Sequence, residues 1–265
     1  MVGLVIVSHS AKLAEGVAEL ARGMAGPDVL IAATGGLDLP DRPLGTDAIL
    51  VQHAVEQVYS DEGVLVLMDL GSAVLSAEMA LDMLPAEQRA RVLLCEAPVV
   101  EGAIAAAVQA RAGSTLEQCA EEARNAIVSK VEHLGTPVPA APPSLPEREA
   151  EGGLKAELRL IVRNRLGLHA RPDARFVQTA NRFKSDIRVS DLSTSRGPAN
   201  AKSMNAVTTL GAAQGHEILV SASGPDAELA LAAFQALADQ NFGDTEADEG
   251  LQTRDKGRVA DVALP

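Results

Sequence analysis

The feature that most constrains this chain is a proline-rich segment near its middle. Residues 134–153 read LGTPVPAAPPSLPEREAEGG, which has no apolar periodicity. This composition predicts an extended, semi-stiff tether, and a chain of 265 residues suggests about two domains. We therefore expect a first domain over 1–133, a linker over 134–153 and a second domain over 154–243. The charged tail, 244–265, has little apolar periodicity and is expected to be mostly disordered.

The first domain alternates short apolar runs with longer helix-like stretches. The apolar runs are 2–7, 29–34, 63–68 and 91–95. The helix-like stretches include 72–84 and a pair at about 100–111 and 114–133. Continuous apolar strands that alternate with helices predict a doubly wound α/β domain, a parallel sheet covered on both faces. In such a sheet the ligand site lies at the carboxyl ends of the strands.

The second domain has a different pattern, in the order βαββαβα. The expected elements are a strand at 157–163, a helix at about 171–182, strands at 186–191 and about 194–201, a short helix from Ser203, a strand at 217–223 and a helix from Asp226. This order predicts an α+β open-faced sandwich, a small antiparallel sheet with its helices on one face.

Charge and composition exclude several classes of function. The formal net charge of −13 argues against a nucleic-acid-binding protein, which needs a basic face. Lys and Arg number 9 against 22 Asp and Glu in 1–153, but 11 against 8 in 154–243, so an acidic half and a mildly basic half could attract each other or a common partner. The sequence has no Walker A loop, no GxGxxG motif and no metal-ligand spacing, so we expect no bound cofactor or metal. The N-terminus has no signal peptide pattern and no run that could span a membrane, which favours a cytoplasmic protein.

A histidine and an aspartate follow two of the expected parallel strands. His9 comes directly after the first strand, and Asp69 comes after the third, with Gly71 and Ser72 at the start of the next helix. An Asp can orient an imidazole through one ring nitrogen and leave the other free to attack, while the helix N–H groups can receive a phosphoryl oxygen. Taken singly, His9 could be a turn residue and Asp69 a helix cap, but their positions at two strand ends favour a site.

A second histidine stands in GLHARPDARFV, residues 167–177. Pro172 fits the first turn of a helix, which places His169 at or just before the helix start. Free backbone N–H groups there form an anion site, and Arg171 adds donors suited to phosphate oxygens. His169 is therefore a phosphohistidine candidate, although a capping histidine beside an exposed arginine would fit the local pattern equally well.

GLHARPDARFVQTANRFKSDIRV, the βαββαβα order and AKSMNAVTTL together resemble HPr, the histidine phosphocarrier of the bacterial phosphotransferase system, over about 156–241. The resemblance implies that His169 is the phosphorylated residue and Arg171 its phosphate partner. Ser203 falls at the position of the regulatory serine of HPr, although an N-cap is the simpler interpretation of this residue.

Residues 1–133 resemble the mannose-type enzyme IIA domains. The resemblance rests on VSHS, the glycine pair in ATGGLDLP, PLGTDAI, MDLGSA and CEAPVVEGAIAAAV, which occur in the expected order. It implies that His9 is phosphorylated, that Asp69 orients it and that the domain forms a homodimer.

A mannose-type IIA domain joined to HPr is the arrangement of the phosphoryl donor subunits of phosphoenolpyruvate-dependent dihydroxyacetone kinase, which act in glycerol metabolism. This resemblance implies a phosphotransferase relay in which a separate enzyme I phosphorylates His169 and the phosphoryl group passes to His9. His9 then donates it to ADP on the nucleotide-binding kinase subunit, and the regenerated ATP phosphorylates dihydroxyacetone on the substrate-binding subunit. Two alternatives remain open: a phosphocarrier for a mannose-class sugar permease, and a regulatory module that binds partners according to its phosphorylation state.

Overall fold

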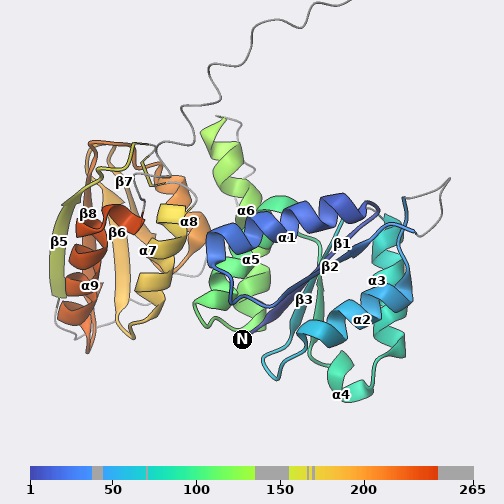
Figure 1. Cartoon of the computed structure of the whole chain (residues 1–265). Coiled ribbons are helices and arrows are strands. Elements are labelled where there is room, and N and C mark those ends of the chain that lie inside the picture. The colour runs from blue at the N-terminus through green and yellow to red at the C-terminus, as the bar shows by residue number, and fades with distance from the viewer. Residues whose placement is uncertain (38–43, 70, 135–154, 166, 169–170, 244–265) are drawn as a thin grey trace, which may run out of the picture.

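The structure, a computed structural model, describes residues 1–37, 44–69, 71–134, 155–165, 167–168 and 171–243. It contains two sheets, one from each side of residues 135–154 (Figure 1). We call residues 1–134 the N-terminal unit and residues 155–243 the C-terminal unit. Residues 135–153 of the predicted linker and the predicted tail lie outside the described residues.

The N-terminal unit is a parallel sheet between two layers of helices. Its elements are β1 (Gly3–Ser8), α1 (Ala11–Ala25), β2 (Ile31–Gly35), α2 (Ala48–Val58), β3 (Val64–Met68), α3 (Gly71–Met83), α4 (Ala86–Arg89), β4 (Val92–Cys95), α5 (Val99–Arg111) and α6 (Leu116–His133). The strands are all parallel, in the order β2-β1-β3-β4. The predicted doubly wound α/β fold is confirmed.

Alternate residues of the buried strands face opposite helix layers. Leu4 and Leu65 pack with the small side chains of α1, α5 and α6, whereas Val5 and Val66 pack with α2 and α3. Many of the helix residues in these layers are alanines, which allow close approach of helix and sheet. Because strands β1 and β3 are covered on both faces, their carboxyl ends are fixed relative to each other.

The C-terminal unit is a four-stranded antiparallel sheet with helices packed on it. Its elements are β5 (Lys155–Ile161), α7 (Arg171–Asn181), β6 (Asp186–Asp191), β7 (Arg196–Asn200), α8 (Met204–Leu210), β8 (Glu217–Ser223), α9 (Ala227–Asp239) and the 3-10 helix η1 (Asn241–Gly243). The strand order is β5-β8-β6-β7. The predicted open-faced sandwich is confirmed, although β5 begins at Lys155 rather than at 157, because Lys155 pairs with Ser223 at the far end of β8.

Aromatic side chains fill the centre of the C-terminal unit. Phe176 lies with its ring centroid 4.6 Å from that of Phe234 and 6.4 Å from that of Phe242. All three side chains are buried.

Among the helices that the structure describes, each is too short or too polar to span a membrane.

Candidate functional site

His9 lies at the carboxyl end of β1, beside the end of β3. Val7 pairs with Met68 in the parallel register, and the Asp69 N–H donates to the Val7 carbonyl at 3.2 Å. The strand register therefore brings His9 next to Asp69, 60 residues later in the chain. This is the meeting of strand ends that a parallel sheet produces.

Asp69 binds His9 and its neighbour through both carboxylate oxygens. Its Oδ1 lies 2.8 Å from His9 Nδ1, and its Oδ2 accepts from the His9 backbone N–H at 2.9 Å and from the Ser8 hydroxyl at 2.8 Å. A carboxylate is an acceptor only, so Nδ1 donates to Asp69, and in the neutral imidazole with this tautomer Nε2 carries the lone pair. The His9 side chain is 23% exposed, so part of the imidazole reaches the surface at this strand end.

The second ring nitrogen of His9, Nε2, faces the start of α3. Nε2 contacts the Ser72 hydroxyl in the first helical turn. Free N–H groups and the positive end of the helix dipole favour an anion at this position. A Cβ added at Gly71 would meet no other atom within 4 Å, so there is open space beside the helix start. The structure thus brings together His9, Asp69 and Ser72, with Gly71 adjoining them.

Other residues of this site escaped the sequence analysis. Thr46 Oγ1 lies 2.8 Å from Ser76 Oγ and 3.3 Å from the Ser72 carbonyl, which joins the segment before α2 to α3. The Gly45 N–H donates to the His9 carbonyl at 2.9 Å. Gly45 and Thr46 lie in PLGTDAI, which supported the family resemblance but gave no sign of a place in this site. Gly35, the last residue of β2, must be a glycine, because a Cβ there would lie 1.7 Å from the Ser8 carbonyl oxygen.

The candidate site of the C-terminal unit is described in part. His169 lies outside the described residues, whereas Arg171 is exposed at the start of α7 and Pro172 follows it in the first turn. Gly167 has a φ of 77°, and a Cβ there would lie 2.3 Å from the Ala212 carbonyl oxygen, so the turn before α7 requires glycine. Ser203 is the N-cap of α8, and its hydroxyl accepts from the Ala206 N–H at 3.1 Å.

A buried carboxyl in α7 was also missed by the sequence analysis. Asp173 is fully buried, and the Thr208 hydroxyl of α8 donates to its Oδ2 at 2.9 Å. Its Oδ1 has no hydrogen-bond partner among the described residues. Burial raises the pKa of Asp173 to about 8, against the opposing effect of the Thr208 hydrogen bond. Asp173 is therefore predominantly protonated at neutral pH, and it adds no charge to the start of α7.

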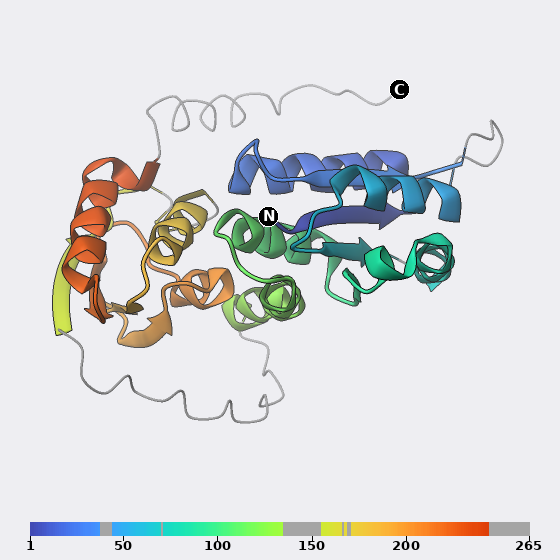
Figure 2. The same cartoon turned by 90° about the horizontal axis from the view of Figure 1, so that it is seen from below.

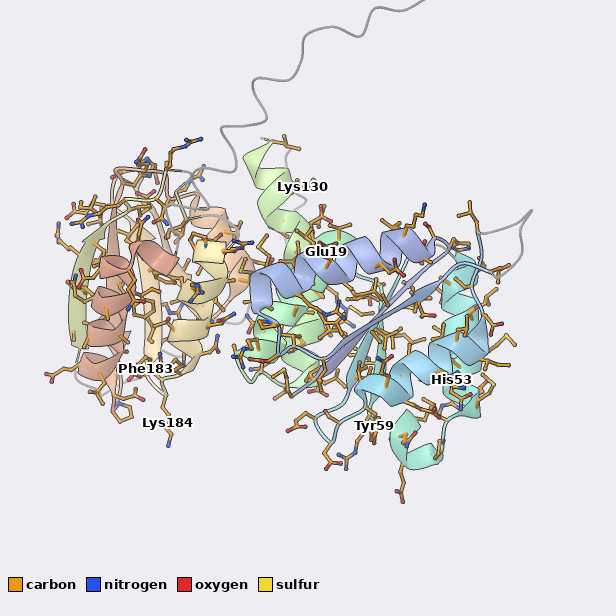
Figure 3. The ribbon with its side chains drawn as sticks, viewed as in Figure 1. Glu19, His53, Tyr59, Lys130, Phe183 and Lys184 are labelled. Atoms are coloured by element: carbon orange, nitrogen blue, oxygen red, sulfur yellow. The ribbon has the colours of Figure 1, made fainter. Side chains whose placement is uncertain are left out.

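Neither His53 nor His216 joins the site around His9. His53 is exposed on the outer side of α2 (Figure 3). The His216 side chain is 26% exposed, and its Nδ1 lies 2.7 Å from the buried Asp191 carboxylate. No group of three or more His, Cys, Asp or Glu side chains that could hold a metal occurs in the part of the chain that the structure describes.

Two known families match this chain, one over the residues of each sheet. Residues 3–120 match the EIIA-man family, described as the PTS system fructose IIA component. Residues 156–240 match the PTS-HPr family, described as the PTS HPr component phosphorylation site. The family matches thus cover both candidate histidines.

Three known proteins illustrate the similarity. The phosphoryl donor subunit DhaM of a PEP-dependent dihydroxyacetone kinase from Pantoea ananatis is 42% identical over 96% of this chain and 53% of its own length. The corresponding subunit of kinase 2 from Listeria innocua is 38% identical over 47% of this chain and 98% of its own length. A crystal structure of HPr from Thermoanaerobacter tengcongensis is 40% identical over 34% of this chain and 98% of its own, with a TM-score of 0.32. The chain spans about half the length of the first of these relatives.

Proposed function

Because the chain belongs to the family of phosphoryl donor subunits of PEP-dependent dihydroxyacetone kinase, we propose that it is a phosphohistidine relay protein. In this proposal, enzyme I takes the phosphoryl group from phosphoenolpyruvate and phosphorylates His169. The group then passes to His9, and from His9 to ADP bound on the nucleotide-binding kinase subunit. The regenerated ATP phosphorylates dihydroxyacetone on the substrate-binding subunit, and all these steps take place in the cytoplasm.

The observation that carries the proposal is the arrangement around His9. Asp69 fixes the imidazole with Nδ1 protonated, and Nε2 points to the start of α3. When Nε2 attacks phosphorus, the ring gains positive charge, which the Asp69 carboxylate stabilises. The Ser72 hydroxyl and the N–H groups at the start of α3 can bind the phosphoryl oxygens. The protein therefore contributes position and charge, which is what a transfer between two nucleophiles requires.

The proposed role of the C-terminal unit rests on the start of α7. The guanidinium of Arg171 suits the phosphoryl oxygens of a phosphorylated His169, and the helix start supplies further N–H donors. Asp173 lies in the same helical turn, and its buried carboxyl is predominantly neutral, so it does not oppose a phosphoryl group there.

The surface beside His9 suits protein partners. Ser72, Leu75 and Met79 share one face of α3, and the two apolar side chains are 61% and 60% exposed. Exposed apolar side chains beside a reactive group are typical of a protein interaction site. We propose that the kinase subunit binds here, and that the N-terminal unit also forms a homodimer, which sedimentation would test.

Reconstitution tests the proposed function. The chain is mixed with enzyme I, phosphoenolpyruvate, the ADP-loaded nucleotide-binding subunit and the substrate-binding subunit, and dihydroxyacetone phosphate is measured. We expect product with the wild type and with the control His53→Ala, and none with His9→Ala or His169→Ala. Product formation by His9→Ala at the wild-type rate would exclude His9 as the donor to ADP.

A further inference from the structure

The C-terminal unit packs on one end of the N-terminal unit. Helices α7 and α8 lie against α5, α6 and the carboxyl end of α1 (Figure 2). Buried apolar residues of both units form one continuous cluster, which includes Ala107 of α5, Val177 of α7 and Val207 of α8. We call the contacted part of α1, α5 and α6 the holding surface.

Side-chain hydrogen bonds join the two units at the holding surface. The Gln109 amide of α5, which is 3% exposed, donates to the Lys202 carbonyl at 2.8 Å. The Asn205 amide of α8 donates to the Glu122 carbonyl of α6 at 2.7 Å, and its backbone N–H donates to the Glu122 carboxyl at 3.2 Å. Because these polar groups are paired across a largely buried contact, the contact has one defined orientation.

A further hydrogen bond shows how far the holding surface lies from His9. The Gln178 amide of α7 donates to the carbonyl of Ala25, the last residue of α1, at 3.2 Å. His9 precedes Ala11, the first residue of the same helix. A helix of 15 residues is about 22 Å long, so the C-terminal unit is bound at the end of α1 opposite His9 (Figure 1).

Phosphoryl transfer between two imidazoles requires a much closer approach. The P–N bond to His169 breaks as a P–N bond to Nε2 of His9 forms, and no other reactant enters, so the two rings must face each other across one phosphorus atom. Reacting atoms in a productive complex lie about 3 to 3.5 Å apart. The α7–α8 side of the C-terminal unit is instead engaged by the holding surface.

We propose that the holding surface keeps the C-terminal unit away from His9, and that release from it precedes transfer to His9. The inference rests on the proposed relay between the two histidines. The chain connection permits release, because the 20 residues 135–154 would span up to about 70 Å when fully extended. After release, the exposed face of α3 around Ser72 receives the C-terminal unit.

Asn205→Asp tests the proposal in the full chain. The variant removes the amide donor and places a second carboxylate beside Glu122, whereas an acidic residue in the first turn of α8 is compatible with the helix. Gln235→Glu adds the same charge at an exposed position of α9 and serves as the matched control. Small-angle X-ray scattering measures the dimensions of each chain, and intact mass spectrometry follows the doubly phosphorylated chain after mixing with enzyme I and phosphoenolpyruvate.

We expect Asn205→Asp to have a larger radius of gyration than the wild type and to form the doubly phosphorylated chain about fivefold faster, with an unchanged rate for the first phosphate. Gln235→Glu should match the wild type in both measurements. Equal dimensions for wild type and Asn205→Asp would overturn the holding contact, and an expanded variant with an unchanged rate would overturn its role. Absence of phosphate on His9 in all three chains would instead overturn the relay itself.

Discussion

The two units place their candidate histidines in different ways. His9 obtains its partners Asp69 and Ser72 from a segment about 60 residues later in the chain, so its geometry depends on the pairing of β1 with β3. In the C-terminal unit, Arg171 is the first residue of α7, and the candidate His169 precedes it by only two positions in the sequence. The cores differ as well, because three phenylalanines pack together in the C-terminal unit, whereas the buried apolar side chains described in the N-terminal unit include no aromatic ring. We therefore expect that substitutions far from His9 in the sequence affect its site more than similarly distant substitutions affect the site at the start of α7.

The substitution with the largest expected effect destabilises the C-terminal unit alone. Phe176→Ala removes the ring that contacts both Phe234 and Phe242 and should lower the unfolding free energy of this unit by about 3–5 kcal/mol. Amide hydrogen exchange should increase in β5–β8 and remain slow in β1–β4. Phe183→Ala, at a partly buried position, should have a smaller effect. Equal loss of protection in both sheets would show that the units unfold together.

The substitution with the next largest expected effect impairs the site around His9 alone. Asp69→Ala removes the acceptor that orients His9, and we expect the transfer from His169 to His9 to slow by about 100-fold. Phosphorylation of His169 by enzyme I should keep its wild-type rate. Asp82→Ala, which removes an exposed carboxylate of α3, is the control. Rapid-quench mass spectrometry measures both steps, and a loss of less than about twofold would refute the orienting role.

A buried carboxyl, Asp173, distinguishes the two units further, because its ionisation changes the stability of the C-terminal unit. The pKa of Asp173 is raised to about 8 by burial, so the folded chain holds a proton that the unfolded chain releases above about pH 4. The contribution of this group to the unfolding free energy is therefore greatest at acidic pH and declines as the pH rises toward 8, by about 1 kcal/mol per pH unit. Asp173→Asn should remove this decline, whereas the exposed Asp239→Asn should retain it. Urea unfolding at several pH values tests this, and parallel curves for wild type and Asp173→Asn would contradict it.

The smallest expected effect concerns the contact between the units. Burial at the holding surface raises the pKa of the Glu122 carboxyl, although a hydrogen bond with Ser203 opposes this change. The charged and titratable neighbours of Glu122 are Glu121 and Cys119 on the same helix and Arg196 of β7, which lines a cavity together with Glu122. A carboxyl whose pKa is higher in the docked state favours docking at low pH and loses this contribution as the pH rises through the raised value.

Glu122→Gln should therefore make docking less sensitive to pH. We expect the wild type to expand between pH 5 and pH 8 and the variant to expand less, with a docked population about twofold larger at pH 8. Small-angle scattering at the two pH values measures the change. The contribution of Glu122 would be refuted if the variant expanded as much as the wild type.

The sequence predicted the elements of both sheets and the pairing of His9 with Asp69, because continuous apolar strands imply that the strand ends meet. It did not predict the Thr46–Ser76 contact, which depends on how α2 and α3 pack. The contact at the holding surface could not be predicted either, because Gln109 and Lys202 are 93 positions apart and neither stands in a recognisable sequence motif. Burial of Asp173 was also missed, because a carboxylate in the first turn of a helix usually lies in solvent.

Counting phosphates on the intact chain tests the relay most directly. The chain is incubated with enzyme I and phosphoenolpyruvate, and its mass is measured at alkaline pH, where phosphohistidine survives. The account predicts two phosphates on the wild type, one on His9→Ala and none on His169→Ala. A wild-type chain without phosphate, or a phosphate on His9 in the His169→Ala variant, would contradict the order of transfer from His169 to His9.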